Sequence, residues 1–274
     1  MPKNKKLIVA NWKMNPQSLT DAKKLFLSIK KTASKLTNVQ TVICPPYVFI
    51  SPLNKLYSGH RIALGVQDVF WKEKGSYTGE VSPEEIKSVG AKYVILGHSE
   101  RRELGETNEM VNKKVIASLK AGLNVILCIG ESKRDAHALY LKFLTEELKT
   151  ALSGVQRKML RNLIVAYEPI WAIGKTTDDA MSPHKMHEMN IFIKKIFAEL
   201  YDKKTALNIP IIYGGSAEPG NVKELLREGE IDGFLVGHAS LDAGEFSEIL
   251  KIANAGKGRS LPCRQAGSRR EVRP

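Results

Sequence analysis

The feature that most constrains the fold is a succession of short apolar runs, each followed by a segment with helical features. The runs are continuous rather than alternating, which is typical of strands buried on both faces of a parallel sheet. We expect eight such strands, at residues 7–10, 39–44, 61–66, 93–96, 125–129, 163–166, 209–213 and 234–236. Eight strands, each followed by a helix, favour an α/β fold with a closed parallel (β/α)8 barrel.

Helix start and stop signals separate these runs. Ser18 is placed to cap a helix, Pro83 opens a short one, and Gly122 ends another. Ser182-Pro183 begins a helix that runs to about Tyr201, and we expect a long helix from Glu131 to Leu152. Further helices are expected at residues 106–121, 219–228 and 245–253.

A doubly wound open sheet is the structural rival of the barrel. Such a sheet more commonly has five or six strands and a G-x-G-x-x-G fingerprint after its first strand, which is missing here. Barrels of this type reach about 250 residues as one unit, so the 274-residue chain needs only one domain. We expect the barrel to occupy residues 1–254, followed by a basic tail at 255–274.

The net charge of +13 is the unusual part of the composition, and the tail contributes strongly to it. Residues 255–274 carry six Lys or Arg side chains against Glu271. A basic tail can attract RNA or a membrane surface, but it is more often a solvated appendage. We expect a disordered tail and no nucleic-acid partner.

Composition also bears on the compartment. No apolar run approaches the roughly 20 residues that cross a bilayer, so we expect no membrane association. The basic start leads into a short apolar run without a small-residue cleavage site, which argues against a secretory signal. Cys44, Cys128 and Cys263 cannot all pair, and none has the spacing of a zinc or redox motif. These observations favour the cytoplasm.

The strongest chemical signal is a carboxylate at the end of the sixth apolar run, where Leu163–Ala166 leads to Glu168. In parallel α/β proteins that rim is where the loops converge and chemistry occurs. The loop between Pro169 and Gly174 is apolar, and a rigid proline and a flexible glycine bound it, as expected of a lid. A lid that excludes water would desolvate Glu168, which suits a general base. The alternative is a strand-end Glu that caps a helix.

A closed barrel would bring Lys13, His98, Glu168, Ser216 and Gly237 to one mouth from five strands. The glycine-rich turns after strands seven and eight are placed where barrels commonly bind phosphate, although tight turns that need a positive φ are an alternative. Lys13 would supply a positive charge to an anionic substrate. Without metal-ligand spacing or a cofactor motif, acid–base chemistry on a phosphorylated small molecule is the natural inference.

Five longer motifs make the prediction more specific. They are Asn11–Asn15, Tyr77–Glu80, Gly97–Arg102, Ala166–Gly174 and Tyr213–Ser216. Together they resemble the triosephosphate isomerase family, in order, from residue 7 to about 254. The resemblance implies a TIM barrel enzyme of glycolysis and gluconeogenesis. It would interconvert dihydroxyacetone phosphate and D-glyceraldehyde 3-phosphate through an enediolate, without a metal or cofactor.

The resemblance also implies a role for each catalytic residue. Glu168 would move a carbon-bound proton between neighbouring carbons, and His98, as a neutral imidazole at a helix start, would polarise the carbonyl and shuttle protons between the oxygens. Lys13 and Asn11 would stabilise the negative enediolate. Glu100, beside His98, would support the site or relay a proton.

Phosphate would be bound by backbone N–H groups of Gly174, Ser216, Gly237 and His238. In the family a long loop corresponding to Gln67–Glu80 enters a pocket of a second subunit, so a homodimer is implied. The alternative is a surface loop folded on its own barrel.

Two departures from the family's pattern affect parts of this prediction. Gly174 is followed by Lys175–Asp179 instead of the usual hinge, and His238 stands where the family has a second glycine. If position 238 needs a positive φ, a side chain there costs roughly 1 kcal/mol or more. We expect instead that His238 points outward.

Two rival functions remain open at this stage. Other phosphate-binding barrels, such as a sugar-phosphate epimerase or an indole-forming lyase, would not be expected to combine Asn11, Lys13, His98 and Glu168. A catalytically silent RNA-binding protein is the rival from another class. Unchanged turnover with lost RNA retention after removal of residues 255–274 would reveal a second role of this kind.

Overall fold

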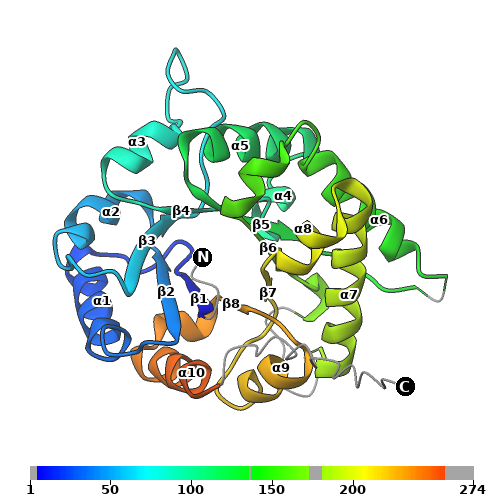
Figure 1. Ribbon diagram of the computed structural model, residues 1–274. Coiled ribbons are helices and arrows are strands. Elements are labelled where there is room, and N and C mark those ends of the chain that lie inside the picture. Colours follow the sequence, from blue (N-terminus) through cyan, green and yellow to red (C-terminus); the bar gives the residue numbers. More distant parts are fainter. Residues whose placement is uncertain (1–4, 136, 173–180, 257–274) are drawn as a thin grey trace, which may run out of the picture.

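The computed structural model describes residues 5–135, 137–172 and 181–256. Its centre is a closed barrel of parallel strands, in which each strand pairs with the next along the chain and β8 pairs with β1 (Figure 1). The strands are β1 Lys6–Asn11, β2 Val39–Cys44, β3 Ile62–Val66, β4 Tyr93–Leu96, β5 Asn124–Ile129, β6 Leu163–Tyr167, β7 Ile211–Tyr213 and β8 Gly233–Val236. The predicted (β/α)8 barrel is confirmed.

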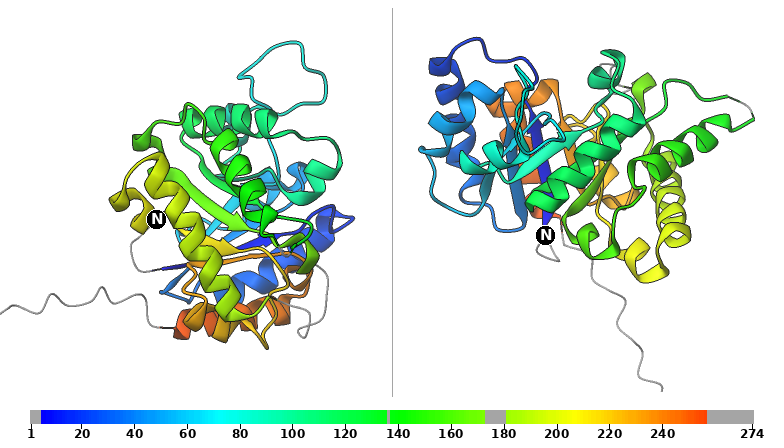
Figure 2. Two further views of the ribbon diagram at one scale, coloured as in Figure 1. Left: turned by 90° about the vertical axis from the view of Figure 1, so that its right-hand side faces the viewer. Right: turned by 90° about the horizontal axis from the view of Figure 1, so that it is seen from above.

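The helices lie around the outside of this ring, as two further views show (Figure 2). They are α1 Leu19–Ala33, α2 Tyr47–Asn54, α3 Pro83–Ser88, α4 Ser99–Glu103, α5 Asn108–Ala121, α6 Leu139–Ala151, α7 Pro183–Leu200, α8 Lys203–Asn208, α9 Val222–Glu228 and α10 Ala243–Ala255. Within the described ranges, no helix combines the length and the apolar character needed to cross a membrane.

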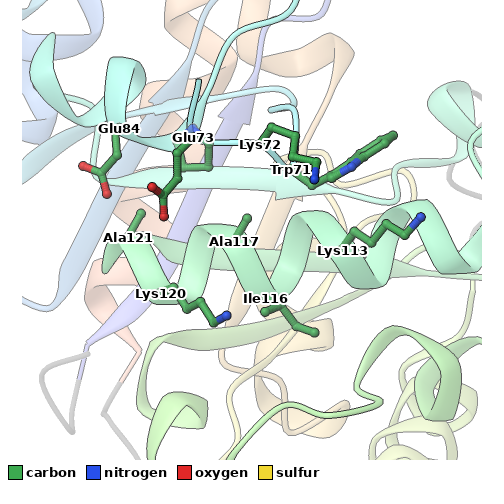
Figure 3. A pocket seen from close by; sticks show the side chains of 10 residues that line it. Trp71, Lys72, Glu73, Glu84, Lys113, Ile116, Ala117, Lys120 and Ala121 are labelled. Atoms are coloured by element: carbon green, nitrogen blue, oxygen red, sulfur yellow. The ribbon is translucent and has the colours of Figure 1, made fainter. Parts of the chain in front are cut away.

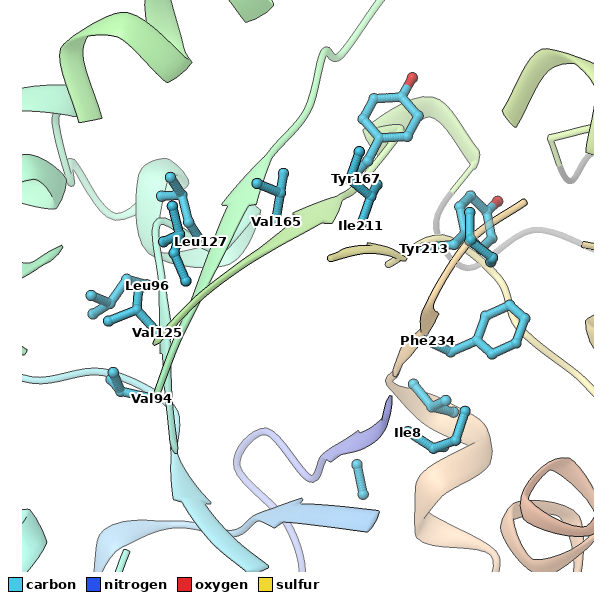
Figure 4. Close-up of a cluster of buried hydrophobic side chains, with 14 of the residues drawn as sticks. Ile8, Val94, Leu96, Val125, Leu127, Val165, Tyr167, Ile211, Tyr213 and Phe234 are labelled. Carbon is cyan, nitrogen blue, oxygen red and sulfur yellow. The ribbon is translucent and has the colours of Figure 1, made fainter. Parts of the chain in front are cut away.

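Successive side chains of each strand enter two different apolar environments. Leu7, Val9 and Ile126 belong to a cluster inside the barrel. The residues between them, such as Ile8 and Val125, join the larger core beneath the helices, and in Figure 4 these side chains project away from the centre of the ring. Because both faces of a strand are buried, both alternating sets must be apolar. This explains the continuous apolar runs of the sequence.

The predicted helix signals act as expected. The Ser18 hydroxyl accepts from the backbone N–H of Asp21, and the Ser182 hydroxyl accepts from that of Lys185. Ser82 forms a capping box with Glu85 at the start of α3. Gly122 ends α5 with a φ of 82°, a left-handed conformation that glycine adopts without steric cost.

The long helix expected from Glu131 is wrong in its first part, since α6 begins at Leu139. Glu131 is buried and accepts hydrogen bonds from the Tyr167 hydroxyl and the Trp171 indole N–H, which hold the chain away from a helical path. The Asp135 carboxylate then accepts from the backbone N–H groups of Leu139 and Tyr140 and so caps α6.

Three smaller differences concern short helices. α8 was not predicted, and it is capped by Asp202, whose side chain accepts from the N–H of Thr205. Residues 99–103 form α4, in accordance with the helix start implied for His98, although no range was predicted for this helix. The helix expected from Pro219 begins at Val222, three residues later.

The connection between β3 and α3 projects from the barrel instead of folding onto it (Figure 1). Its root is closed by the backbone N–H of Phe70, which donates to the carbonyl of Val81 at 2.8 Å. Every residue from 72 to 80 is exposed. A loop with so few contacts to its own barrel is available to a partner.

The ring closes where β8 meets β1, and this junction leaves no room for a side chain. Leu7 pairs with Gly233, and a Cβ built at Gly233 would lie 1.8 Å from the Leu7 carbonyl oxygen. The carbonyl oxygen belongs to the backbone and the position of a Cβ is fixed by it, so neither can move by rotation of a side chain. A glycine at the start of β8 is therefore a condition of barrel closure.

We predict that Gly233→Ala lowers the free energy of unfolding by about 3 kcal/mol or more, because β1 and β8 must separate to admit the methyl group. Urea unfolding followed by circular dichroism at one protein concentration measures the loss. Gly256→Ala is the control, since its Cβ would meet only the Ala253 carbonyl oxygen at 3.6 Å. Equal stability of the two variants would contradict this account of closure.

Candidate active site

The four predicted catalytic residues lie at the carboxyl ends of three strands. Asn11 is the last residue of β1 and Lys13 follows it, His98 follows β4, and Glu168 follows β6. A continuous series of contacts joins them. Lys13 Nζ lies 2.5 Å from Glu100 Oε1, Glu100 Oε2 lies 3.9 Å from His98 Nδ1, and His98 Nε2 lies 3.5 Å from Glu168 Oε1. The structure thus brings these residues to one mouth.

Backbone hydrogen bonds hold Glu168 and the residues that follow it. Its N–H donates to the carbonyl of Ile129 at 2.8 Å, and the N–H of Ile170 donates to that of Glu131 at 3.1 Å. The side chain is 2% exposed, and its Oε2 accepts from the backbone N–H of Ser99 at 3.3 Å. Oε1 has no hydrogen-bond partner among the described residues. One carboxylate oxygen is therefore anchored and the other is unengaged beside His98.

Two glycines make the space that Glu168 occupies. A Cβ at Gly214 would lie 2.6 Å from Glu168 Cγ, and a Cβ at Gly130 would lie 1.8 Å from the Glu168 carbonyl oxygen. Gly214 is not among the glycines with a positive φ, and neither are Gly215 and Gly237. The tight-turn alternative for these positions is therefore wrong. At Gly130 and Gly214 a glycine is required because the backbone passes close to Glu168.

His98 is oriented by the short helix that follows it. Its Nδ1 accepts from the backbone N–H of Glu100 at 3.2 Å, so this nitrogen carries no proton. A neutral ring then has its proton on Nε2, the nitrogen that faces Glu168. The hydrogen bond fixes both the tautomer and the direction of the donor.

Lys13 has a strained backbone that places its ammonium group. Its φ is 52°, an uncommon value for a residue with a side chain. Its N–H donates to Asn11 Oδ1 at 3.1 Å, and its carbonyl accepts from Gln67 Nε2 at 2.9 Å. The same Gln67 nitrogen also donates to the carbonyl of Cys44. Such strain persists only where the surroundings enforce it, and Gln67, which the sequence analysis did not select, supplies part of that support.

The predicted phosphate loops are near these residues, as far as the described ranges extend. The Ser216 hydroxyl donates to the carbonyl of Ala172 at 3.0 Å and so joins the connections after β6 and β7. A Cβ at Gly237 would lie 3.5 Å from Lys13 Cε, which places the turn after β8 beside the lysine. Gly174 and Lys175–Asp179 lie outside the described residues.

His238 imposes no backbone strain on the turn after β8. The described non-glycine residues with a positive φ are Lys13, Ala138 and Glu230, so the steric cost considered for position 238 does not arise. His238 is exposed, in accordance with an outward side chain.

A buried polar group that the sequence analysis missed supports the connection after β6. The Glu131 carboxylate accepts from the Tyr167 hydroxyl, the Trp171 indole and Arg134 Nε, at 2.8, 3.0 and 2.9 Å. Burial and the negative charge of Glu131 raise the pKa of Tyr167, so its hydroxyl stays protonated as a donor. The position of Glu131 just after a strand could have indicated a functional carboxylate, but the partners of Glu131 lie up to 40 residues away in the sequence.

Cys128 lies inside the barrel below Glu168. Burial and the charge of Glu168 raise the pKa of this thiol, which argues against a thiolate nucleophile. Cys263 lies outside the described residues. Within the described parts of the chain, no group of three or more His, Cys, Asp or Glu side chains could hold a metal ion.

A separate hollow of about 300 Å³ lies outside the mouth, between α3, α5 and the root of the projecting loop (Figure 3). Its lining includes Trp71, Glu84 and Lys113, and Lys113 Nζ lies 5.4 Å from the centre of the Trp71 indole ring. None of the predicted site residues lines this hollow.

Comparisons with known proteins agree on one family. The model of the family described as "Triosephosphate isomerase" matches residues 6–253. The "Triosephosphate isomerase" of Thermoanaerobacter pseudethanolicus is 43% identical over 246 residues, which cover 89% of this chain and 98% of that protein. The proteins of the same name from Geotalea uraniireducens and Endomicrobium trichonymphae are 40% and 38% identical, and each alignment covers 91% of this chain and 99% of the relative.

We predict that Gly214→Ala lowers triose phosphate turnover about 10- to 100-fold without unfolding the barrel, because the new methyl group displaces Glu168 from its anchored position. A coupled assay and the thermal midpoint measure the two effects. Gly220→Ala on the same connection is the control, since nothing lies within 4 Å of its Cβ. Full activity of Gly214→Ala would show that the slot does not position Glu168.

Proposed function

Because the chain belongs to the triosephosphate isomerase family and is an aldose–ketose isomerase of triose phosphates, we propose that Asn11, Lys13, His98 and Glu168 carry the reaction. The observation that supports this most directly is the contact series from Lys13 through Glu100 and His98 to Glu168. It combines a base, a proton donor and a cation within one mouth. These are the groups that an enediolate intermediate requires.

Glu168 is the base. With the C1 hydroxymethyl of dihydroxyacetone phosphate beside Oε1, the carboxylate takes a proton from C1. The electron pair forms the C1–C2 double bond, and the carbonyl oxygen on C2 becomes negative. Returning the same proton to C2 regenerates the carboxylate and leaves the aldehyde of glyceraldehyde 3-phosphate at C1. The near-complete burial of Glu168 supports this role, because water cannot compete for the proton.

His98 serves the two oxygens. Its Nε2–H gives its proton to the oxygen on C2 as charge develops there. The ring then takes a proton from the hydroxyl on C1, which returns it to its neutral state. The backbone N–H that occupies Nδ1 supports a single reactive nitrogen. Because the ring is held by its own helix start, the donor needs no reorganisation during the reaction.

Lys13 and Asn11 stabilise the negative charge of the enediolate and the phosphate. Lys13 Nζ is paired with the half-exposed Glu100, which keeps the ammonium at the mouth until an anion arrives. The phosphate is bound by backbone N–H groups of Gly174, Ser216, Gly237 and His238. For Gly174 this rests on the resemblance alone.

The enzyme works as a homodimer in the cytoplasm, with residues 1–254 as its catalytic barrel. The projecting loop supports the dimer, as Tyr77 is 42% exposed at its tip. Met14 and Val48 are also exposed on connections whose neighbours contact the loop's root, since Gln67 bonds Lys13 and the Tyr47 hydroxyl donates to the Asp68 carbonyl. Such apolar side chains around one loop are typical of an interface.

We predict that Glu168→Asp and His98→Gln each lower kcat about 10²- to 10⁴-fold, because each removes a positioned proton-transfer group. A coupled assay in both directions measures the loss, with circular dichroism to confirm that the variants fold. Rates equal to that of the parent chain in both variants would defeat the assignment of roles.

We also predict that Thr78→Arg converts the protein to single chains and lowers its turnover, because a long cation at the loop tip cannot be buried in a partner. Sedimentation equilibrium measures the mass. Ser58→Arg is the matched control, since Ser58 is exposed at the opposite end of the barrel, before β3. A mass of one chain for the unaltered protein would overturn the dimer.

A further inference from the structure

A buried ion pair lies beneath the mouth and takes no part in the mechanism above. Glu147, on the inner face of α6, is 1% exposed, and Arg102, on α4, has a side chain 17% exposed. Arg102 Nε lies 3.4 Å from Glu147 Oε1. Neither that oxygen nor Arg102 Nη2 has a hydrogen-bond partner among the described residues. A buried ion pair in which each partner has an unsatisfied polar atom costs desolvation energy, which a functional role would explain.

Glu147 holds the turn that supports the base. Its Oε2 accepts from the backbone N–H of Gly130 at 3.0 Å. The carbonyls on either side of Gly130, those of Ile129 and Glu131, accept the N–H groups of Glu168 and Ile170. The turn from 129 to 131 therefore carries the backbone around Glu168, and Glu147 fixes its middle.

Arg102 holds the turn that supports the electrophile. Its Nε donates to the carbonyl of Gly97 at 2.8 Å, and Gly97 directly precedes His98. Its Nη1 donates to Asn108 Oδ1 at 2.6 Å, which ties the guanidinium to α5. Arg102 is thus anchored at one side, so an attraction to Glu147 acts on the Gly97 turn.

We propose that Glu147 and Arg102 are a positioning pair, in which the charge of Glu147 sets the distance between the turn that carries His98 and the turn that carries Glu168. The inference rests on the proposed function of those two residues. Neither member of the pair touches the substrate.

The charge of Glu147 changes near neutral pH. Burial raises its pKa to about 7, against the opposing effect of Arg102 and the Gly130 N–H, and the negative charges of Glu168 and Glu131 add to the increase. Above pH 7 the carboxylate is charged and attracts Arg102. Below pH 7 it is neutral, so the attraction is lost as the pH falls. The positioning effect is therefore present at alkaline pH and absent at acid pH.

Glu147→Gln tests this directly, because the amide keeps an oxygen for the Gly130 N–H and has no charge at any pH. We expect kcat to fall about tenfold at pH 8.5 with little change in KM, since misplacement affects the reacting groups and not the phosphate site. At pH 5.5 the ratio of parent to variant should approach one. The ratio cancels the titration of the substrate phosphate, which has a pKa near 6.

Glu146→Gln is the matched control, because Glu146 is the exposed neighbour on the same helix. A ratio for Glu147→Gln that is the same at all pH values, or that equals one at pH 8.5, would overturn the proposal. The parent chain is measured in the same assay, so its inactivity would instead contradict the proposed function.

Arg102→Lys provides a second, independent variant, since the lysine keeps a positive charge but cannot hold Gly97 and Asn108 together. We expect a similar loss of kcat at pH 8.5 and no further loss when both changes are combined, because the two residues act as one unit. A hundredfold loss in the double variant would show independent effects and would contradict the pair.

Discussion

The closure of β8 onto β1 is the constraint on which the rest of the structure depends. The eight strands are parallel to one another, so once the eighth pairs with the first, their carboxyl ends share one mouth. Lys13 and Gly237, 224 positions apart in the sequence, then lie beside one another. This closure is possible because Gly233 has no side chain, which lets β8 approach the backbone of β1.

The polar groups at the mouth are held in fixed orientations by hydrogen bonds from their neighbours. Glu168 has one oxygen anchored by the Ser99 N–H, His98 has one nitrogen occupied by the Glu100 N–H, and Lys13 is held through its own backbone. The other carboxylate oxygen of Glu168 then lies 3.5 Å from the other ring nitrogen of His98. Preorganisation of this kind lets the protein stabilise developing charge without reorganising at the moment of reaction.

Local chemistry was sufficient to predict most of the fold. The bounds of β2 and β4 were predicted to the residue. Ser18 and Ser182 cap helix starts and Gly122 ends a helix, as predicted. The start of α6 was wrong because Glu131 and Asp135 suit a helix locally, whereas Tyr167 and Trp171, far along the chain, bind Glu131 in another conformation. Of the four proposed catalytic residues, Lys13, His98 and Glu168 were selected from their places at strand ends, and Asn11 from motif resemblance. Gln67, Arg102 and Glu147 were missed because each acts through a partner that no local pattern reveals. The proposed catalytic roles, the dimer and the compartment stay predictions.

The root of the projecting loop is also part of the site. Gln67 grips the carbonyl of Lys13, and the next residue, Asp68, is bound by the charged groups of Lys114 and Arg101. A partner bound to the outer end of this loop would therefore act on the same segment that holds the backbone of Lys13. In the proposed dimer, assembly would therefore bear on the position of Lys13.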